Sequence, residues 1–214
     1  MTKTTKEIRT SLNLLNKVLS SLVDDLGDIP IGDEGHFPFG WRKSAKGRTV
    51  WRLIEEAISQ NLEISAEKLG LIDFSPASSE VGVYDFSYSH DGKQKSYVNI
   101  KSAVQGARKN KDDVSKAIKL KSFLEENPDA ILLIASIEIA FSEKPMRVSL
   151  ERCYIVPITW LPDIYVNPSN NGNLQSSKYK DFDLCIERTN QEFLEVLSSE
   201  IEVAKIKKAK KAAK

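Results

Sequence analysis

The sequence predicts a single α/β domain in which a mixed β-sheet is flanked by helices. Three features predict it: an amphipathic helical pattern over 5–26, two alternating segments over 83–88 and 96–103 joined by a polar turn, and an unbroken apolar segment over 130–141. Antiparallel strands followed by a helix and a strand buried on both faces indicate a sheet with both parallel and antiparallel neighbours. The length of 214 residues suits one domain with a substantial core.

The predicted helices follow from apolar periodicity. The N-terminal helix repeats apolar residues at alternating spacings of four and three, namely Ile8, Leu12, Leu15, Leu19, Leu22 and Leu26. Such a stripe is typical of packing against a core, with a dimer seam as the alternative. A second helix is predicted over about 48–61, a third over 112–127 that opens on two aspartates, and a last one from about Asn190.

The predicted strands are bounded by turn and loop signals. "HDGK" supplies the turn between the two alternating segments. A further strand is expected over 153–161, broken by Pro157. The Gly- and Pro-rich residues 27–40 and the Asn-, Ser- and Gly-rich residues 163–181 are predicted to be irregular loops.

Basic residues gather in three places although the net charge is only +1. Residues 41–52 hold five basic residues and no acid, residues 101–121 hold seven against two aspartates, and the last ten residues hold six lysines. Such clusters can neutralise phosphates and give sequence-independent affinity for nucleic acid. A solvated surface is the equally reasonable alternative for any one of them.

Cysteine, histidine and hydropathy patterns narrow the class of protein further. Two cysteines without a CxxC pair and two histidines predict neither a zinc cluster nor a disulfide framework. No segment reaches the roughly 18 apolar residues of a membrane span, and no signal peptide is recognisable at the N-terminus. We therefore expect an intracellular protein without a membrane segment.

The segment 83–103, "VYDFSYSHDGKQKSYVNIKSA", places three polar residues where β-branched and aromatic residues are usual. Asn99 and Lys101 are two positions apart on one strand and share a face. Antiparallel pairing around the turn can bring Asp85 close to that face. Carboxylate and amide oxygens suit Mg²⁺, and a nearby lysine could orient a water. The arrangement indicates metal-assisted hydrolysis of a phosphodiester.

At these residues the sequence resembles the PD-(D/E)xK nuclease superfamily and, within it, type II restriction endonucleases. Asp85 matches the first acid of the family pattern and Lys101 matches its lysine. Asn99 departs from the pattern, because Asp or Glu usually occupies that position, although some restriction enzymes of the superfamily carry Asn there. The missing negative charge should weaken metal binding. Tyr84 stands where the pattern has Pro.

The resemblance implies a restriction-endonuclease-like fold and a set of roles. Asp85, Asn99 and the backbone carbonyl of Ile100 would bind Mg²⁺, and Lys101 would position or activate water. The family also tends to place a glutamate on the helix before the hairpin. Glu55 and Glu56 are the candidates, and we favour Glu55, one turn beyond Trp51.

The resemblance further implies an organisation and a setting. The single domain would span 1–204, with the N-terminal helix, a catalytic core over about 48–141 and a recognition region over about 153–181; residues 205–214 would form a lysine-rich tail. A homodimer that cuts a specific site in double-stranded DNA, in a prokaryotic cytoplasm, would be expected. The alternatives are a non-cleaving DNA-binding module on the same fold, and a repair or recombination nuclease of the superfamily.

DNA contacts are expected from basic and amide side chains on both sides of the motif. Asn and Gln can pair with adenine, and Arg or Lys with guanine, whereas Asn and Gly also cluster in ordinary turns. The expected contacts are Arg42, Lys43, Lys46, Arg48, Gln105, Arg108, Lys109, Asn170, Asn171, Asn173, Gln175 and Lys178.

Overall fold

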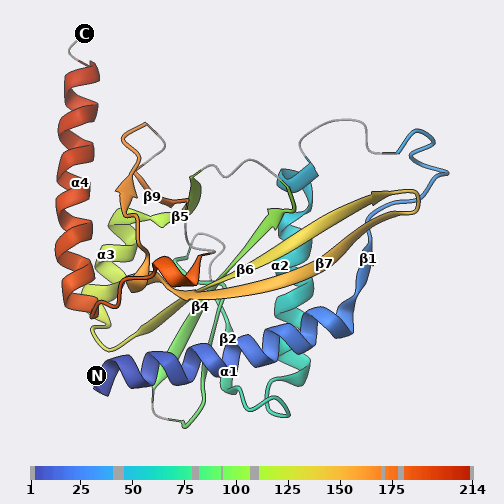
Figure 1. The fold of residues 1–214 in the computed structure, drawn as a ribbon, viewed down its shortest axis with the longest axis horizontal. Coiled ribbons are helices and arrows are strands. Elements are labelled where there is room, and N and C mark those ends of the chain that lie inside the picture. The colour runs from blue at the N-terminus through green and yellow to red at the C-terminus, as the bar shows by residue number, and fades with distance from the viewer. Residues whose placement is uncertain are drawn as a thin grey trace.

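The computed structural model confirms the predicted fold class, a mixed β-sheet flanked by helices (Figure 1). It describes residues 3–40, 46–78, 82–92, 94–106, 111–169, 172–177 and 181–212, and the side chains of 3–4 and 46–49 lie outside that description. Within these ranges no helix is long and apolar enough to cross a membrane.

The main sheet has six strands in the order β1-β7-β6-β4-β3-β2. Its strands are β1 (Asp28–Pro30), β2 (Ile72–Pro76), β3 (Phe86–Ser89), β4 (Lys95–Val104), β6 (Ile131–Glu143) and β7 (Met146–Pro157). The long strands β4 and β6 run parallel, with Asn99 opposite Ile134 and Lys101 opposite Ser136, while the other neighbours are antiparallel. The sheet is therefore mixed, as predicted.

Helices cover both faces of this sheet, which explains why β6 is apolar from Ile131 to Phe141 except at Ser136 and Glu138. One core joins α1 (Lys3–Leu26) and α2 (Lys46–Ser65) to alternate strand residues such as Ile100 and Ile137. The other core joins α3 (Ala117–Glu126) and α4 (Asn190–Ala212) to the intervening residues such as Ile134. Since successive strand side chains point to opposite faces, a strand with two covered faces is apolar at most of its positions.

A second, three-stranded sheet is the main feature that the sequence did not predict. Its strands β5 (Asp112–Lys116), β8 (Tyr165–Val166) and β9 (Asn173–Ser176) lie in the order β5-β9-β8. The helix predicted over 112–127 is therefore wrong in its first five residues, because these pair with β9 and the helix starts only at Ala117. The loop predicted over 163–181 likewise contains two strands. We call β5, β9 and β8 the small sheet.

Several predicted boundaries also differ. The loop predicted over 27–40 begins with β1, which pairs with β7, and β2 was not predicted. The strand predicted over 153–161 starts at Met146, and a 3-10 helix, Ile158–Trp160, follows it. A second 3-10 helix is Phe182–Leu184. The residues predicted as a lysine-rich tail from 205 continue α4, which remains helical through Ala212.

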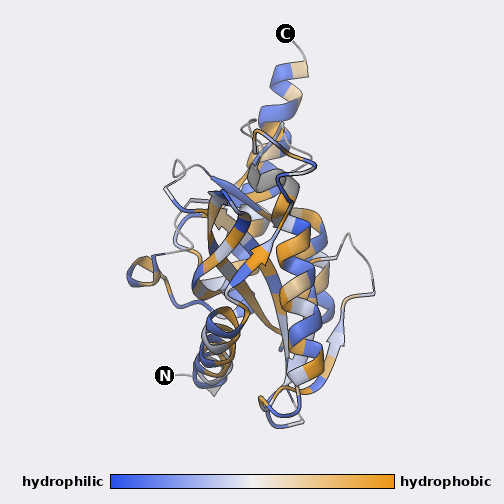
Figure 2. Cartoon of the chain, turned by 90° about the vertical axis from the view of Figure 1, so that its right-hand side faces the viewer, coloured by the Kyte–Doolittle hydropathy of each residue, from blue (hydrophilic) through white to orange (hydrophobic). Residues whose placement is uncertain are grey.

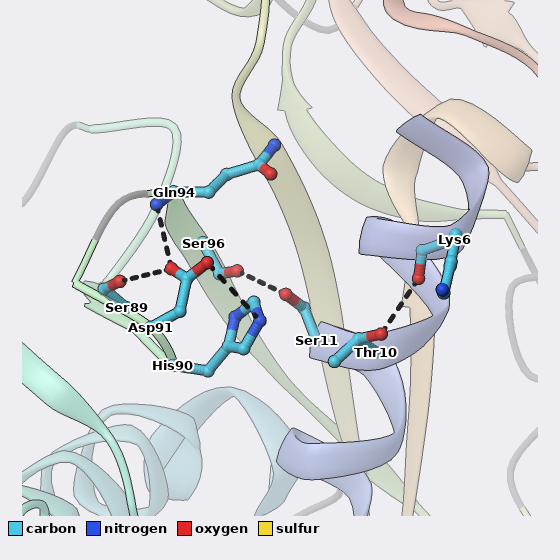
Figure 3. A network of polar contacts seen from close by, with 8 residues as sticks. All are labelled: Lys6, Thr10, Ser11, Ser89, His90, Asp91, Gln94 and Ser96. Atoms are coloured by element: carbon cyan, nitrogen blue, oxygen red, sulfur yellow. Dashed lines mark hydrogen bonds and ion pairs between the residues drawn. The ribbon is translucent and has the colours of Figure 1, made fainter. Parts of the chain in front are cut away.

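A polar network at the β3–β4 turn holds this hairpin in register and ties it to α1 (Figure 3). Ser96 Oγ donates to Ser11 Oγ at 2.9 Å, and Asp91 accepts hydrogen bonds from Ser89 Oγ at 3.4 Å and the Gln94 backbone N–H at 3.2 Å. A slip of one residue in the pairing would turn every β4 side chain to the opposite face. The turn therefore also determines which residues of β4 lie beside Asp85, the residue directly before β3.

Candidate active site

Asp85 lies directly before β3 and continues the pairing of β3 with β4. Its backbone N–H donates to the Val98 carbonyl at 2.7 Å, and its Oδ2 accepts a hydrogen bond of 2.6 Å from the backbone N–H of Ile100. The strand pairing ends at Phe86 opposite Val98, so the Asp85 carboxylate takes the place of the next backbone acceptor along the edge of β4.

The same geometry orients the carbonyl of Ile100. The N–H and C=O groups of one residue in a strand point to the same side. Because the N–H of Ile100 points at Asp85, its carbonyl oxygen also points to the side of β4 on which Asp85 lies. A carboxylate oxygen and a backbone oxygen thus lie on the same edge of the strand.

Asn99 is buried between the main sheet and β5, with 5% of its surface exposed. Its Nδ2 donates to the backbone carbonyls of Val83 at 3.0 Å and Val114 at 3.5 Å. Since both neighbours are acceptors, the amide nitrogen must face them. Its Oδ1 is buried without a hydrogen-bond partner in the described part of the chain. Such an acceptor costs about 1–3 kcal/mol, so it calls for a partner.

Of the two candidate glutamates, the structure places Glu55 beside the motif. Glu55 is 7% exposed on the side of α2 that packs against β4, whereas Glu56 is exposed and accepts a hydrogen bond from Gln60 at 2.8 Å. Burial raises the pKa of Glu55 to about 7; the charge of Asp85 raises it too, while Lys101 and Arg52 lower it.

The pKa of Asp85 is also raised, chiefly by burial. The hydrogen bond from the Ile100 N–H and the charges of Lys101 and Arg52 act in the opposite direction. Burial therefore disfavours the charged forms of both Glu55 and Asp85, and the nearby cations Lys101 and Arg52 partly offset this effect. Perturbed carboxylates of this kind concentrate at functional sites, because a bound cation or a transferred proton can relieve them.

These residues meet in a cleft of about 220 Å³, which we call the central cleft. The motif and α2 form one wall, and β5 and Asn173 of the small sheet form the other. A wider cleft of about 550 Å³, the outer cleft, shares Arg52, Glu55 and Asp85 with it and is otherwise lined by residues that include Glu56 and Glu63. The predicted residues Asp85, Asn99, Lys101 and Glu55 thus all line the central cleft.

The donor set of the central cleft fits Mg²⁺. The ion prefers oxygen ligands and keeps several waters, so it needs few protein groups. Asp85, the unpartnered Oδ1 of Asn99 and the Ile100 carbonyl provide such oxygens, with Glu55 nearby. In the described ranges no three His, Cys, Asp or Glu side chains form a metal cluster. A metal here would therefore depend on the amide and backbone oxygens.

Most of the residues predicted to contact DNA lie outside the described residues. These are Arg42, Lys43, Arg108, Lys109, Asn170, Asn171 and Lys178, while Lys46 and Arg48 belong to α2 with their side chains outside the description. Gln105 is exposed just beyond β4. Asn173 lines the central cleft.

Gln175 and Asn173 both donate to Asp113, at 2.6 Å and 3.0 Å. The Gln175 Oε1 also accepts a hydrogen bond from Asn167 at 3.2 Å. Both ends of the Gln175 side chain are therefore engaged within the small sheet and its adjoining loop. Asn173 keeps a buried Oδ1 without a hydrogen-bond partner in the described part of the chain.

Some residues of the central cleft were not predicted as part of the site. Arg52 lies 3.7 Å from Glu55, between Nη1 and Oε2, and its guanidinium is stacked 4.3 Å from the centre of the Trp51 ring. The sequence placed Arg52 only in a basic segment; its position three residues before Glu55 on a helix was the available signal. Asp113 and Lys116 were missed because β5 was assigned to a helix.

Comparisons with known proteins return similar solved structures only. No protein-family model and no curated protein matches the sequence. The NlaIV restriction endonuclease is similar at 11% identity and a TM-score of 0.44, over 64% of this chain and 54% of that chain, or about half of that enzyme. The Holliday junction resolvase Hjc of Archaeoglobus fulgidus is similar at 12% identity and a TM-score of 0.34, over 65% of this chain and 98% of that chain. At these TM-scores neither likeness bears on function, and the function proposed below is argued from the site.

Proposed function

We propose that the chain is a Mg²⁺-dependent endonuclease that hydrolyses phosphodiester bonds of double-stranded DNA at specific sites, as type II restriction enzymes do. The observation that carries the proposal is the central cleft itself. There a hydrogen-bonded aspartate, a buried glutamate with a raised pKa, a lysine and an unpartnered amide oxygen lie together. This combination suits a divalent cation and an anionic substrate at once.

In this mechanism Asp85, Asn99 and the Ile100 carbonyl would hold Mg²⁺. When bound there, the ion would supply polarisation of the phosphodiester and a lower pKa for a coordinated water. Lys101 orients the attacking water and offsets charge that develops on the phosphate. Glu55, whose pKa is raised to about 7, is matched to accept a proton near neutral pH. The hydrogen bond from the Ile100 N–H holds the Asp85 carboxylate in place.

Glu55 can compensate for the negative charge that is missing at Asn99. The usual acid at this position would bring a second negative charge to the metal, and asparagine brings only a neutral oxygen. The Glu55 carboxylate interacts electrostatically with Asp85 across the site. We infer that Glu55 supplies from α2 the charge that β4 lacks.

Plasmid or phage DNA tests the proposal directly. Purified protein is incubated with DNA and Mg²⁺, beside reactions with EDTA, with Lys101→Ala and with Lys95→Ala, which removes an exposed lysine of the same strand. We expect discrete fragments with the unaltered protein and with Lys95→Ala, and none with EDTA or Lys101→Ala. DNA that is bound but remains intact with the unaltered protein would refute the proposal.

A non-cleaving DNA-binding module is the second candidate, and Asn99 is the observation that favours it. On that hypothesis the neutral side chain marks a site that no longer binds its metal. Intact, shifted DNA is its expected result. Random degradation, or cutting that depends on DNA structure, would instead favour a repair or recombination nuclease.

We further propose a homodimer, because an enzyme that cuts a palindromic site in both strands needs two copies of its single site. Light scattering coupled to size-exclusion chromatography measures the mass in solution. The chain mass is 24.0 kDa, so a dimer is expected at twice that value, and a monomer both alone and on a palindromic duplex would contradict it.

A further inference from the structure

The C-terminal end of α4 extends beyond the body of the protein. Ala204 is the last core residue of the helix, and every residue from Lys205 to Ala212 is exposed. Figures 1 and 2 show this end of α4 projecting past the small sheet, and Figure 2 shows that it is largely hydrophilic. At about 1.5 Å per residue, these eight residues form an arm about 12 Å long.

Four lysines share one side of this arm. With about 100° of rotation per residue, Lys207, Lys208, Lys210 and Lys211 fall within an arc of about 160°, and Ile206 and Ala209 lie outside it. We call these four lysines the lysine face. Lys205, outside the arc, pairs with Glu202 at 2.6 Å, and Glu202 is the last acid in the sequence. Among the described residues, none of the four forms an ion pair.

The arrangement of the lysine face is unfavourable in isolation. Lysines three and four residues apart on a helix lie side by side and repel each other. Cations near the C-terminal end of a helix interact favourably with the helix dipole. One or two lysines would be enough for this interaction, so it does not account for four. A bound polyanion would relieve the repulsion among all four.

One lysine of the lysine face, Lys207, lies beside the small sheet. The Nζ of Lys207 lies 5.9 Å from the centre of the Tyr165 ring in β8, and the Nζ of Lys111 lies 4.0 Å from the same ring. Lys111 immediately precedes β5, and Lys116 at the other end of β5 lines the central cleft. Lysines therefore mark a path from the central cleft, along β5, to the arm.

Two acids along this path, Asp113 and Asp163, are engaged in the small sheet. Asp113 accepts hydrogen bonds from Asn173 and Gln175. Asp163 accepts them from Ser176 and from the backbone N–H of Ser177, and the charge of Lys111 also lowers its pKa. Their hydrogen-bonding capacity is directed at protein groups, while the lysine face remains exposed to solvent.

We propose that the lysine face, with Lys111, binds the phosphate backbone of duplex DNA where the duplex leaves the central cleft. That the polyanion is DNA rests on the proposed function. That the lysine face binds a polyanion does not depend on it. One strand of a duplex presents a phosphate about every 3.4 Å along the axis. The lysine face covers about 6 Å of the arm, from Lys207 to Lys211, so its four lysines lie opposite two or three phosphates of that strand.

The test measures binding in EDTA, so that no cleavage is needed. Fluorescence anisotropy gives Kd for a 30-base-pair duplex over a series of salt concentrations. The variant carries Gln at 207, 208, 210 and 211, because Gln and Lys have similar helix propensities. The matched control carries Gln in place of four exposed lysines elsewhere, Lys6, Lys17, Lys68 and Lys95. Circular dichroism checks that both remain helical.

We expect the lysine-face variant to bind at least about tenfold more weakly at 100 mM salt. Its slope of log Kd against log salt should fall by about 0.9 for each phosphate that the variant no longer neutralises. The control should retain nearly all of the affinity for the duplex.

Unchanged affinity and salt slope in the lysine-face variant would overturn the proposal. An equal decrease in the control would do so too, because it would show an effect of net charge alone. The proposal would also be overturned if the lysine-face variant bound DNA as the unaltered protein does but no longer bound phosphatidylserine vesicles. That result would assign the arm to a lipid surface.

These outcomes are separable from the test of cleavage. If binding depends on the lysine face but the protein does not cut DNA, only the proposed nuclease function is refuted. Cleavage by a protein whose binding ignores the lysine face would refute only the present inference. No duplex binding by the unaltered protein would refute both.

Discussion

The amide nitrogen of Asn99 lies 3.0 Å from the carbonyl oxygen of Val83 and donates a hydrogen bond to it. A second carbonyl, that of Val114, lies 3.5 Å from the same nitrogen. An ionised aspartate at this position would point a carboxylate oxygen at two backbone acceptors. The backbone around position 99 is therefore built for an amide, which gives a structural reason for asparagine rather than aspartate at this position.

Asn99→Asp should consequently destabilise the protein rather than improve its metal site. We expect a loss of about 1–3 kcal/mol in the free energy of unfolding at pH 8 in EDTA, the cost of an unsatisfied buried polar group. A protonated carboxyl can donate to Val83, so the folded-state pKa of the new aspartate would be raised. Stability from such a group is present at low pH and lost as pH rises, so the destabilisation should shrink at pH 5.

Urea unfolding at the two pH values measures this, with Asn13→Asp on the exposed side of α1 as control. Equal stability of Asn99→Asp and the unaltered protein at pH 8 would show that the Val83 carbonyl does not select asparagine.

The hairpin motif could be predicted because its determinants are local. The "HDGK" turn and the alternation of side chains along a strand were enough to bring Asp85 to the face of Asn99 and Lys101. The feature that distinguishes Glu55 from Glu56 is not local in the sequence. Both lie off the apolar stripe of α2, and only the packing of that helix against β4 buries Glu55.

The second wall of the central cleft could not be predicted from sequence patterns. Residues 112–116, "DDVSK", have low strand propensity, and their partner β9 lies about 60 positions away. Two aspartates before an amphipathic segment look like the start of a helix. Long-range pairing overrode that preference, and Asp113 and Lys116 became residues of the cleft as a result.

Glu55 should make the stability of the protein fall between mildly acidic and mildly alkaline pH. Its folded pKa is raised from 4.5 to about 7, so the folded protein binds the proton more tightly than the unfolded chain does. The resulting stability is fully present below pH 4.5 and is lost as pH rises through about 7. The raised pKa of Asp85 acts in the same direction.

Glu55→Gln should flatten this dependence and be the more stable protein at pH 8, by at least about 1 kcal/mol, since one pKa unit is worth about 1.4 kcal/mol. Urea unfolding in EDTA at pH 5 to 8 provides the measurement. Glu56→Gln, an exposed neighbour, serves as control and should keep the slope of the unaltered protein. A slope that Glu55→Gln leaves unchanged would contradict the assignment.

Arg52 should influence the pH dependence of cleavage. Its charge lowers the pKa of both Glu55 and Asp85, so Arg52→Gln should raise both and move the acid limb of the kcat/KM profile to higher pH. We expect a several-fold decrease in activity at pH 7 that is largely recovered at pH 9. A decrease of the same size at every pH would instead indicate that Arg52 acts only in binding.

The matched control for Arg52 is Arg147→Gln on β7. Arg147 lies 3.7 Å from Asp28, the same separation as between Arg52 and Glu55, but outside both clefts. This substitution should leave the pH profile in place.

Mg²⁺ should stabilise the protein more at pH 8 than at pH 5. Protons compete with the metal for Glu55 and Asp85, whose raised pKa values leave both carboxyls more protonated in mild acid than ordinary carboxyls. For a Kd near 1 mM, 10 mM Mg²⁺ adds about 1.4 kcal/mol to the free energy of unfolding. Thermal unfolding with and without the ion at each pH measures this increase.

Asp85→Asn tests whether the stabilisation by Mg²⁺ comes from the central cleft. The asparagine oxygen can still accept the hydrogen bond from the Ile100 N–H, so the β3–β4 pairing should survive while the charge that attracts the metal is removed. We expect the Mg²⁺-dependent shift in Tm to disappear in Asp85→Asn and to persist in Asp129→Asn, an exposed aspartate elsewhere. A full shift in Asp85→Asn would place the bound metal away from Asp85, and the proposed catalytic cleft would then be without its cation.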